Sequence, residues 1–503
     1  MNNNPMAQEF SVTITDLTVD GRGIGHLTAQ DVLFLSQGAV PLPEEESGRT
    51  VFVYGALPGD VVRFRVQKKK KNIVEGQAVA LLTPSPKRRM VTSHPYTQNG
   101  DLSYLGDKSD DDALSPHDGF PLLSWEPAEQ KAWKMRRVHE ALVRVGGFSD
   151  STLPKAEDAS PLTDSETEPF SASNLPNIDW IAAEEMHYRN KINLRLTPDG
   201  RLGDTARNGK VRPLSSYVIA APILEQKLQQ WNGLALQTPH WAKTLSAVRM
   251  VILRVNEKGE TMAALVTDPL SSSQRNAIFT LLQPLSFTVL CQGQNRRPGD
   301  VRLREPISYA TKRRTLQTTL DGHSFMISPP SFFQVNRFLT PVLYAKALSF
   351  FSSLADSTIL DLYCGTGTTS LLLAQQAKRV IGVEMVEAAV ADARQNAERN
   401  GLTNVSFIAA KAEEILPQLT ADLKNEHLCV LVDPPRKGLD ESVRRSLLST
   451  DLRELVYISC YPETLARDLR DFRQQGWMLD RLCVSDMFPN TPEIETVVLM
   501  SQH

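Results

Sequence analysis

The chain has few cysteines for its length, and their positions in the sequence do not form the pattern of a disulfide-bonded or zinc-binding protein. Five cysteines occur in 503 residues, none lies before position 291, and no two are separated by only two residues. This distribution argues against a disulfide framework and a zinc knuckle, and it is typical of proteins from a reducing compartment. The five residues are Cys291, Cys364, Cys429, Cys460 and Cys483.

Long hydrophobic runs and a basic, apolar leader are also absent. No apolar run reaches the roughly 18 residues that would span a bilayer. The first residues, Met-Asn-Asn-Asn-Pro, have neither the basic nor the apolar stretch of a signal sequence. We therefore expect a cytoplasmic protein without a membrane partner.

A large excess of charge of either sign is absent as well. Lys and Arg number 55 against 58 Asp and Glu, so composition alone does not predict a nucleic-acid partner. Residues 60–90 differ from this average, with nine basic and two acidic side chains. Such an excess suits phosphate groups, although a solvated hairpin tip would have the same composition. The basic residues are Arg63, Arg65, Lys68, Lys69, Lys70, Lys71, Lys87, Arg88 and Arg89.

The length of the chain predicts two or three domains. Short runs of alternating apolar and polar residues, separated by glycine turns, predict a small β-barrel or sandwich between Phe10 and about Thr83. Residues 127–145 have the apolar spacing of a helix, and a mixed α/β region follows from Tyr188 to about Ile327. The acidic stretch 101–118 and the Ser/Thr/Pro-rich stretch 149–177 are expected to be loops or insertions.

The last third alternates short apolar strands with helices, which predicts a doubly wound parallel sheet. Its first expected strand ends before Cys364-Gly365-Thr366-Gly367, and Glu384 ends the second strand 23 residues after Asp361. The glycines permit close approach of a ligand, and an acid at the second position commonly binds the hydroxyls of a ribose. The turn lacks the G-x-G-x-x-G spacing and a Walker lysine, so neither NAD nor ATP fits well.

Cys460 is the cysteine whose position suggests chemistry. It follows the apolar run Val456–Ser459 and lies 27 residues after Asp433, in the sequence Asp-Pro-Pro-Arg. Ligands of α/β enzymes bind outside the carboxyl ends of the strands, so a thiol there is a candidate nucleophile. Taken alone, a buried strand-end thiol is the simpler interpretation. For Cys364, Cys429 and Cys483 we expect packing in the core.

Two stretches resemble known families. The pattern Asp16-Leu-x-x-Asp20-Gly-x-Gly-x-Gly25, followed by Ala56-Leu-Pro-Gly-Asp60-x-Val62, is similar to the TRAM domain, a small RNA-binding barrel. Asp361-x-Tyr-Cys-Gly-Thr-Gly with Gly-Val-Glu384 resembles the S-adenosylmethionine site of Rossmann-like methyltransferases. Adding Asp433-Pro-Pro-Arg, Ile458-Ser-Cys460 and Ser328-Pro-Pro-Ser-Phe-Phe-Gln-Val-Asn makes the chain resemble the RNA 5-methyluridine methyltransferase family over nearly its whole length.

The resemblance implies three domains and an RNA partner. It predicts an OB-like TRAM barrel at 1–91, a mixed α/β RNA-binding domain at 92–324, and a Rossmann-like methyltransferase domain at 325–503. The branch that modifies 23S ribosomal RNA is the best match, because the bacterial transfer-RNA branch usually lacks the barrel. Transfer RNA as substrate, or an RNA-binding protein with an inactive methyltransferase fold, remain alternatives. An inactive protein would be expected to lose Cys460 or Glu495, and both are present. We expect a monomer.

The resemblance also assigns roles to single residues. Cys460 would be the nucleophile that adds to carbon 6 of uracil, and Glu495 the base that later removes the proton from carbon 5. Gln334, Tyr363 and Glu384 would contact S-adenosylmethionine, and Asp433 would lie between cofactor and uracil. An enzyme that methylates amino groups would have Asn in place of Asp433 and would not need Cys460.

Several positions depart from the family pattern. Glu493 stands where histidine is usual, and residues two apart on a strand point to the same side, so Glu493 and Glu495 are both candidates for one site. Thr368 and Lys411 stand where asparagine is common, which leaves their contacts with the cofactor open.

The cluster ligands of the family are missing. Members of the ribosomal branch often hold an iron–sulfur cluster through four cysteines. The corresponding positions here are His94, Gly100, Ser103 and Ala221. We therefore expect an enzyme without an iron–sulfur cluster or another metal.

Overall fold

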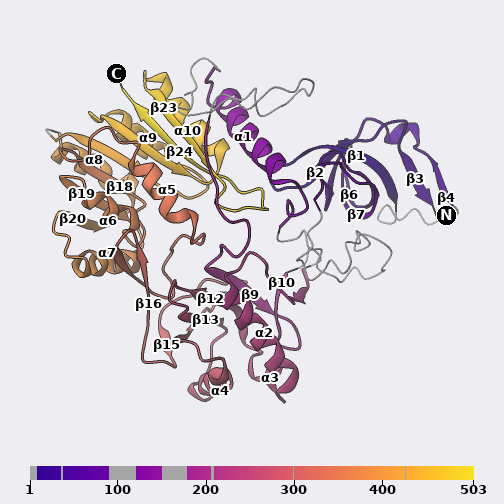
Figure 1. Cartoon of the computed structure of the whole chain (residues 1–503), viewed down its shortest axis with the longest axis horizontal. Coiled ribbons are helices and arrows are strands. Elements are labelled where there is room, and N and C mark those ends of the chain that lie inside the picture. Colours follow the sequence, from indigo (N-terminus) through magenta and orange to yellow (C-terminus); the bar gives the residue numbers. More distant parts are fainter. Residues whose placement is uncertain are drawn as a thin grey trace. The chain divides into compact units, whose positions relative to one another are not determined.

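The computed structural model describes residues 8–35, 38–89, 120–149, 178–205, 209–297, 299–424 and 426–502, which form two compact units (Figure 1). The first unit comprises Met1–Trp133, Thr205–Arg212 and Phe488–Glu493; the second comprises Lys134–Asp204, Pro213–Met487 and Ile494–His503. The boundary falls inside helix α1 (Pro127–Arg144), which matches the helix expected from the sequence. The stretch 101–118, and all but the first residue of 149–177, lie outside the described residues.

The first unit contains a closed five-stranded barrel. Its strands pair in the order β1-β2-β5-β7-β6, and β6 pairs again with β1, which closes the ring. Phe10, Val12, Val62 and Phe64 point inward and are completely buried, as the alternating pattern predicted. The strands of the unit are β1 (Glu9–Leu17), β2 (Gly23–His26), β3 (Val32–Leu35), β4 (Gly38–Pro41), β5 (Thr50–Tyr54), β6 (Val61–Lys69) and β7 (Ile73–Thr83), with a 3-10 turn at Glu44–Glu46.

Asp60 ties the barrel to the segment that follows it. Its carboxylate is fully buried and accepts backbone N–H groups of Leu57 and Ser85 at 2.7 and 2.9 Å. The guanidinium of Arg88 donates to both carboxylate oxygens at 2.8 and 2.7 Å. Gly59 precedes it with φ +87°, and a Cβ there would meet the Ser85 hydroxyl at 2.6 Å. The backbone conformation and the close approach of Ser85 therefore require glycine at position 59, and the buried ion pair with Arg88 requires the carboxylate of Asp60.

We expect Asp60→Ala to destabilise the barrel by about 3–5 kcal/mol, because the buried Arg88 guanidinium loses its counter-charge. Hydrogen exchange of the β6 and β7 amides in the full chain measures this locally. The matched control is Asp20→Ala, which removes the more exposed ion pair to Arg22 and should cost no more than about 1 kcal/mol. Equal losses in the two variants would contradict the role assigned to Asp60.

The second unit begins with a mixed sheet in the order β10-β9-β12-β13-β14-β15. All neighbours in it are antiparallel except β13 and β14, which are parallel and joined through helix α4. Its elements are β9 (Lys191–Leu196), β10 (Leu202–Thr205), β12 (Val248–Val255), β13 (Thr261–Thr267), β14 (Val289–Gln294), β15 (Ile307–Tyr309), α2 (Pro222–Gln237), α3 (Trp241–Thr244), α4 (Ser272–Leu282) and a 3-10 turn at Gln283–Leu285. A short strand, β11 (Val211–Pro213), and a hairpin of β16 (Leu316–Leu320) and β17 (His323–Ile327) complete this region.

The C-terminal sheet of the second unit has eight strands in the order β20-β19-β18-β21-β22-β24-β23-β8. The first five are parallel, and β24 is antiparallel to both β22 and β23. The strands are β8 (Asp179–Ile181), β18 (Thr358–Leu362), β19 (Arg379–Glu384), β20 (Val405–Ala409), β21 (Leu428–Val432), β22 (Glu454–Ser459), β23 (Met478–Ser485) and β24 (Glu495–Ser501). This is the doubly wound, Rossmann-like sheet expected from the sequence.

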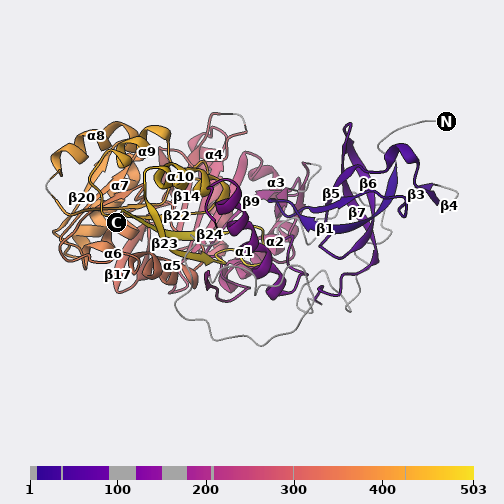
Figure 2. The same cartoon turned by 90° about the horizontal axis from the view of Figure 1, so that it is seen from above.

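Helices cover both faces of this sheet. Figure 2 shows α8, α9 and α10 on one side of it and α5 and α6 on the other. The helices are α5 (Leu339–Leu348), α6 (Thr368–Ala374), α7 (Glu387–Arg399), α8 (Ala412–Asp422), α9 (Glu441–Leu448) and α10 (Pro462–Gln474). The central strands β18, β21 and β22 are buried on both faces, and their sequences are almost continuously apolar, whereas the edge strand β20 is more exposed.

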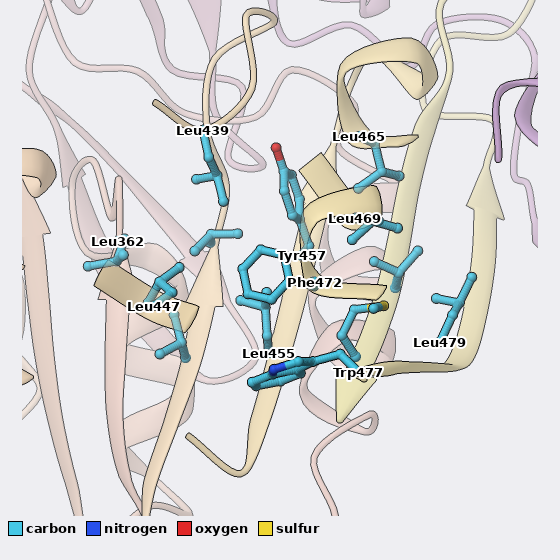
Figure 3. Packing of buried hydrophobic residues seen from close by; sticks show 14 of the residues in the cluster. Leu362, Leu439, Leu447, Leu455, Tyr457, Leu465, Leu469, Phe472, Trp477 and Leu479 are labelled. Atoms are coloured by element: carbon cyan, nitrogen blue, oxygen red, sulfur yellow. The ribbon is translucent and has the colours of Figure 1, made fainter. Parts of the chain in front are cut away.

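A dense core fixes β22, the strand that leads to Cys460. Figure 3 shows Tyr457, Phe472 and Trp477 packed among leucines of the neighbouring elements. The rings of Phe472 and Trp477 meet edge to face at 5.5 Å, and the buried Tyr457 hydroxyl donates to Asp468 at 2.8 Å. This packing restricts the movement of β22 and therefore the position of Cys460, which follows its last residue.

None of the helices in the described part of the chain is long and apolar enough to cross a membrane. The division into three domains, with boundaries after residues 91 and 324, stays a prediction.

Candidate active site

The ends of three neighbouring strands bring Cys460, Glu495 and Asp433 together. Cys460 follows β22, whose last residue pairs with Thr496 of β24, so the antiparallel register places Glu495 opposite Cys460. Residues opposite each other in such a pair have side chains on the same face. Asp433 follows β21, the other neighbour of β22, and its N–H donates to the Leu362 carbonyl at 3.3 Å.

Cys460 differs from the other four cysteines in its exposure. It is partly exposed, whereas Cys291, Cys364, Cys429 and Cys483 are buried, as expected for core cysteines in the case of the last three. Burial raises the pKa of the Cys460 thiol to about 12, and the charges of Glu495 and Asp433 add to this effect, while Arg436 opposes it. The raised pKa favours the protonated thiol in the free protein, and its proton must be removed when it reacts.

We expect Cys460 to be alkylated by iodoacetamide about 30-fold more slowly than an ordinary thiol at pH 8. A pKa near 12 instead of 9 lowers the thiolate fraction about 1,000-fold, and the greater nucleophilicity of a more basic thiolate offsets roughly half of that exponent. The rate should rise about tenfold per pH unit up to the highest pH at which the fold survives. Mass spectrometry of the Cys460 peptide measures it; a plateau below pH 9 would contradict the raised pKa.

A second carboxylate group lies behind Asp433. Asp361 is the buried second-last residue of β18, and one of its oxygens accepts hydrogen bonds from the hydroxyls of Thr369 and Ser370. Its other oxygen, Oδ1, is buried without a hydrogen-bond partner. Burial raises the pKa of Asp361 to about 6, and burial together with the charge of Asp361 raises the pKa of Asp433 to about 7. The site thus has a surplus of negative charge that a bound cation would relieve.

The turn that follows β18 has free space beside its backbone at Gly365, and a third acidic residue, Glu384, contacts this turn. Tyr363 has φ +66° and packs against the main core while partly exposed. Gly365 follows with φ +55°, and a Cβ there would meet nothing within 4 Å. The Glu384 carboxylate accepts the N–H of Gly365 at 3.2 Å and that of Val386 at 2.8 Å, which fixes it at the end of β19.

Gln334 is connected to these acids by Tyr344, a residue that the sequence analysis did not single out. Its side chain hydrogen-bonds the Tyr344 hydroxyl, and its carbonyl accepts the Asn190 amide at 3.2 Å. The buried Tyr344 lies on α5, and burial together with the charges of Asp433, Glu495 and Asp361 raises its pKa well above the usual value. Tyr344 therefore links the candidate cofactor residue to the candidate catalytic residues. The helix Leu339–Leu348 also contains Thr340 and Lys346, so its sequence contained no signal that singled out Tyr344.

Three further positions singled out in the sequence lie as follows. Thr368 is the buried first residue of α6, and Lys411 is exposed and paired with Glu414 at 2.7 Å. Glu493 precedes β24, which begins only at Glu495, and its N–H donates to Thr491 Oγ1 at 3.3 Å. The alternation rule used to place Glu493 and Glu495 on one side therefore does not apply, because Glu493 is not part of the strand.

One of the four positions of the family's cluster ligands is described. Ala221 is buried and caps the N-terminus of α2. His94, Gly100 and Ser103 lie outside the described residues. In the described part of the chain, His, Cys, Asp and Glu form no group able to hold a metal ion.

The basic segment of the first unit is largely paired. Arg63 and Arg65 contact Glu9 at 3.5 and 2.9 Å, and Arg88 is buried on Asp60. Lys68 and Lys71 are exposed near the tip of the β6–β7 hairpin. The positive charge offered to a partner is therefore smaller than the sequence count suggested.

The residues around Asp361 fit S-adenosylmethionine, which carries a sulfonium and an ammonium group. An unpartnered buried carboxylate oxygen and two carboxyl groups with raised pKa suit a cation, and the space beside Gly365 allows close approach. The Glu384 carboxylate is placed to accept hydroxyl groups.

Comparison with known proteins identifies two family models. The tRNA (Uracil-5-)-methyltransferase model matches residues 314–503, and the TRAM domain model matches residues 7–79. An uncharacterized RNA methyltransferase of Geobacter sulfurreducens is 31% identical and covers 98% of this chain and 89% of its own. One of Clostridium tetani is 29% identical, covering 98% and 96%.

A solved structure has the same fold over almost the entire chain. It is the tRNA (uracil-54, C5)-methyltransferase of Pyrococcus abyssi in complex with S-adenosyl-L-homocysteine, with a TM-score of 0.65 and 21% identity. The match covers 97% of this chain and 100% of that one. By the family models and the relatives that match it over nearly its whole length, the chain belongs to the S-adenosylmethionine-dependent RNA uracil-C5 methyltransferases and carries a TRAM domain.

Proposed function

We propose that this enzyme methylates carbon 5 of a specific uridine in 23S ribosomal RNA through a covalent adduct between Cys460 and carbon 6 of the base. Gln334, Tyr363 and Glu384 would hold S-adenosylmethionine, and Asp433 would lie between it and the uracil. When bound, the cofactor supplies an electrophilic methyl group. The observation that carries the proposal is the placement of Cys460, Glu495 and Asp433 at adjoining strand ends.

The chemistry explains the need for a thiol and a base. Carbon 5 of uracil is a weak nucleophile. When the Cys460 thiol loses its proton and its sulfur bonds to carbon 6, the electron pair of the 5,6 double bond moves into an enolate whose carbon 5 can accept the methyl group. S-adenosylhomocysteine would be the leaving group of that transfer. Glu495 then takes the proton from carbon 5, the electron pair of that C–H bond restores the double bond, and the bond to sulfur breaks. Cys460 leaves as a thiolate and regains a proton, so the enzyme returns to its starting state.

The pKa of Cys460 is consistent with a nucleophile that is activated only on substrate binding. Its thiol lies against two carboxyl groups, both of which disfavour the thiolate in the free protein. Proton removal and attack on carbon 6 would then occur together, which protects the thiol from adventitious reaction. Asp433 has a raised pKa near 7, so the acid form that could donate a hydrogen bond to the uracil is accessible at neutral pH.

The RNA must expose its target base. A base inside a stack cannot reach a thiol at the end of a β-strand, and removing it from the stack costs a few kcal/mol, less in a flexible loop. We therefore propose a single-stranded or loop uridine as target, with the TRAM barrel as one RNA-binding element.

Transfer RNA is the second candidate substrate. The tRNA (uracil-54, C5)-methyltransferase of Pyrococcus abyssi shares its fold with 97% of this chain. The barrel therefore does not by itself separate ribosomal from transfer RNA.

The test is covalent trapping with 5-fluorouridine-substituted RNA and labelled S-adenosylmethionine. Fluorine at carbon 5 cannot leave as a proton does, so the adduct should accumulate and survive denaturing electrophoresis. A complex formed with ribosomal RNA would support the proposal, and one formed only with transfer RNA would support the second candidate. Transfer of label to unsubstituted uridine without a trapped adduct would contradict the covalent mechanism.

A further inference from the structure

Basic side chains gather beside the segment Ser328–Asn336, on the mixed sheet of the second unit. Lys191 is the first residue of β9, and the register of β9 with β12 places Arg254 directly opposite it. Residues opposite each other in an antiparallel pair have side chains on one face. Arg189 lies two residues before Lys191 and adds a third positive charge that acts on it.

Lys191 and Arg254 have no carboxylate partner among the residues that the structure describes. Arg254 is 2% exposed; its Nη2 donates to the Ser331 carbonyl at 2.8 Å, and its Nη1 is buried without a hydrogen-bond partner. Burial and the charges of Arg254 and Arg189 lower the pKa of Lys191 to about 7. Burial lowers the pKa of Arg254 to about 10. Like charges opposite each other and a buried unpaired donor both destabilise the folded protein.

The same region is joined to the candidate active site. The N–H of Asn190 donates to the Val335 carbonyl at 2.8 Å, and its side-chain amide donates to the Gln334 carbonyl. The Gln334 side chain bonds Tyr344, whose hydroxyl is within electrostatic reach of Asp433 and Glu495. An anion held by Lys191 and Arg254 would therefore belong to a molecule that extends from the active site.

We propose that Lys191 and Arg254 form a binding site for a backbone phosphate of the RNA, next to the target uridine. A phosphate would accept hydrogen bonds from Arg254 Nη1 and the Lys191 ammonium and would neutralise the excess positive charge. Contacts of this kind position the RNA without reading its sequence. The inference rests on the proposed function, because it assumes an RNA chain in this site.

The test is binding of a fluorescent nine-residue oligouridylate by the full-length protein at several salt concentrations. For Lys191→Met we expect affinity to fall about tenfold, as for a lost charged hydrogen bond. The slope of log affinity against log salt should decrease by about 0.7, the value for one phosphate contact on a single strand. Lys191→Arg should retain the slope. Lys243→Met, which removes an exposed lysine of α3 in the same unit, should leave it unchanged.

Two further readouts exclude other roles for the cluster. The melting temperature of Lys191→Met should rise, because a charge without a partner is removed; a lower value would mean that a structural partner already neutralises it, and would overturn the proposal. Affinity for S-adenosylmethionine, measured by calorimetry, should not change. Weaker cofactor binding with an unchanged salt slope would assign the cluster to the cofactor carboxylate instead. These assays involve no methyl transfer, so they are independent of the covalent trapping that tests the proposed function.

Discussion

Replacing Cys460 by alanine is expected to lower methyl transfer by at least about four orders of magnitude, as the loss of a catalytic nucleophile does. Without the thiol, no bond to carbon 6 forms and carbon 5 stays unreactive. The variant should give no covalent complex with 5-fluorouridine-substituted RNA on denaturing gels. Its fold should be preserved, because the side chain is only partly buried at the end of β22.

Two measurements make this result specific. Affinity for S-adenosylmethionine should be that of the unmodified protein, since the cofactor residues assigned here do not include Cys460. The matched control is Cys483→Ala, which removes a fully buried thiol from β23 of the same sheet and should lower stability but retain the adduct. An adduct in Cys460→Ala that persists and maps to another residue would refute the assignment of the nucleophile.

Glu495→Gln is expected to separate the two halves of the reaction. The thiol still adds and the methyl group is still transferred, but no carboxylate removes the proton from carbon 5, so a methylated covalent adduct accumulates even with ordinary uridine. Turnover should fall about 100- to 10,000-fold, as is usual for the loss of a general base. The adduct is measured by the comigration of labelled methyl groups with protein and RNA.

Glu493→Gln is the control for that experiment. Glu493 lies two residues away, before the strand begins, and has no register position opposite Cys460. We expect it to turn over without accumulating an adduct. If Glu493→Gln traps the adduct and Glu495→Gln does not, the base is Glu493 and the present assignment is wrong.

The large losses of activity expected for Cys460→Ala and Glu495→Gln have a common structural reason. Cys460 directly follows β22 and Glu495 is the first residue of β24, and both strands contribute to the buried core, in which Tyr457 of β22 packs with Phe472 and Trp477. Such packing restricts the strand ends, and a small error in position costs a reaction of this kind much of its rate. The proposed chemistry therefore needs the side chains of Cys460 and Glu495, and the many core residues that pack around β22 and β24 determine where these two side chains lie.

Much of this protein could be predicted from its sequence because the relevant signals are local. Strand and helix periodicity gave the parallel sheet over residues 358–433, since buried parallel strands are apolar throughout. Alternating apolar residues separated by glycine turns predicted the barrel between Phe10 and Thr83, because a strand with one buried face needs apolar side chains at every second position. The roles of Cys460 and Glu495 were predicted from motifs that lie 35 residues apart.

Only the tertiary structure decided which groups meet. The register of β22 with β24 places Glu495 opposite Cys460 and leaves Glu493 outside the strand, which no count along the chain reveals. Tyr344 gains its contact with Gln334 because α5 packs on the sheet, and Lys191 meets Arg254 across two strands 63 residues apart in the chain. The basic count of residues 60–90 overstated the free charge because pairing is a long-range event. Local patterns determine which elements form; the energies of charge, burial and hydrogen bonding depend on neighbours that only folding supplies.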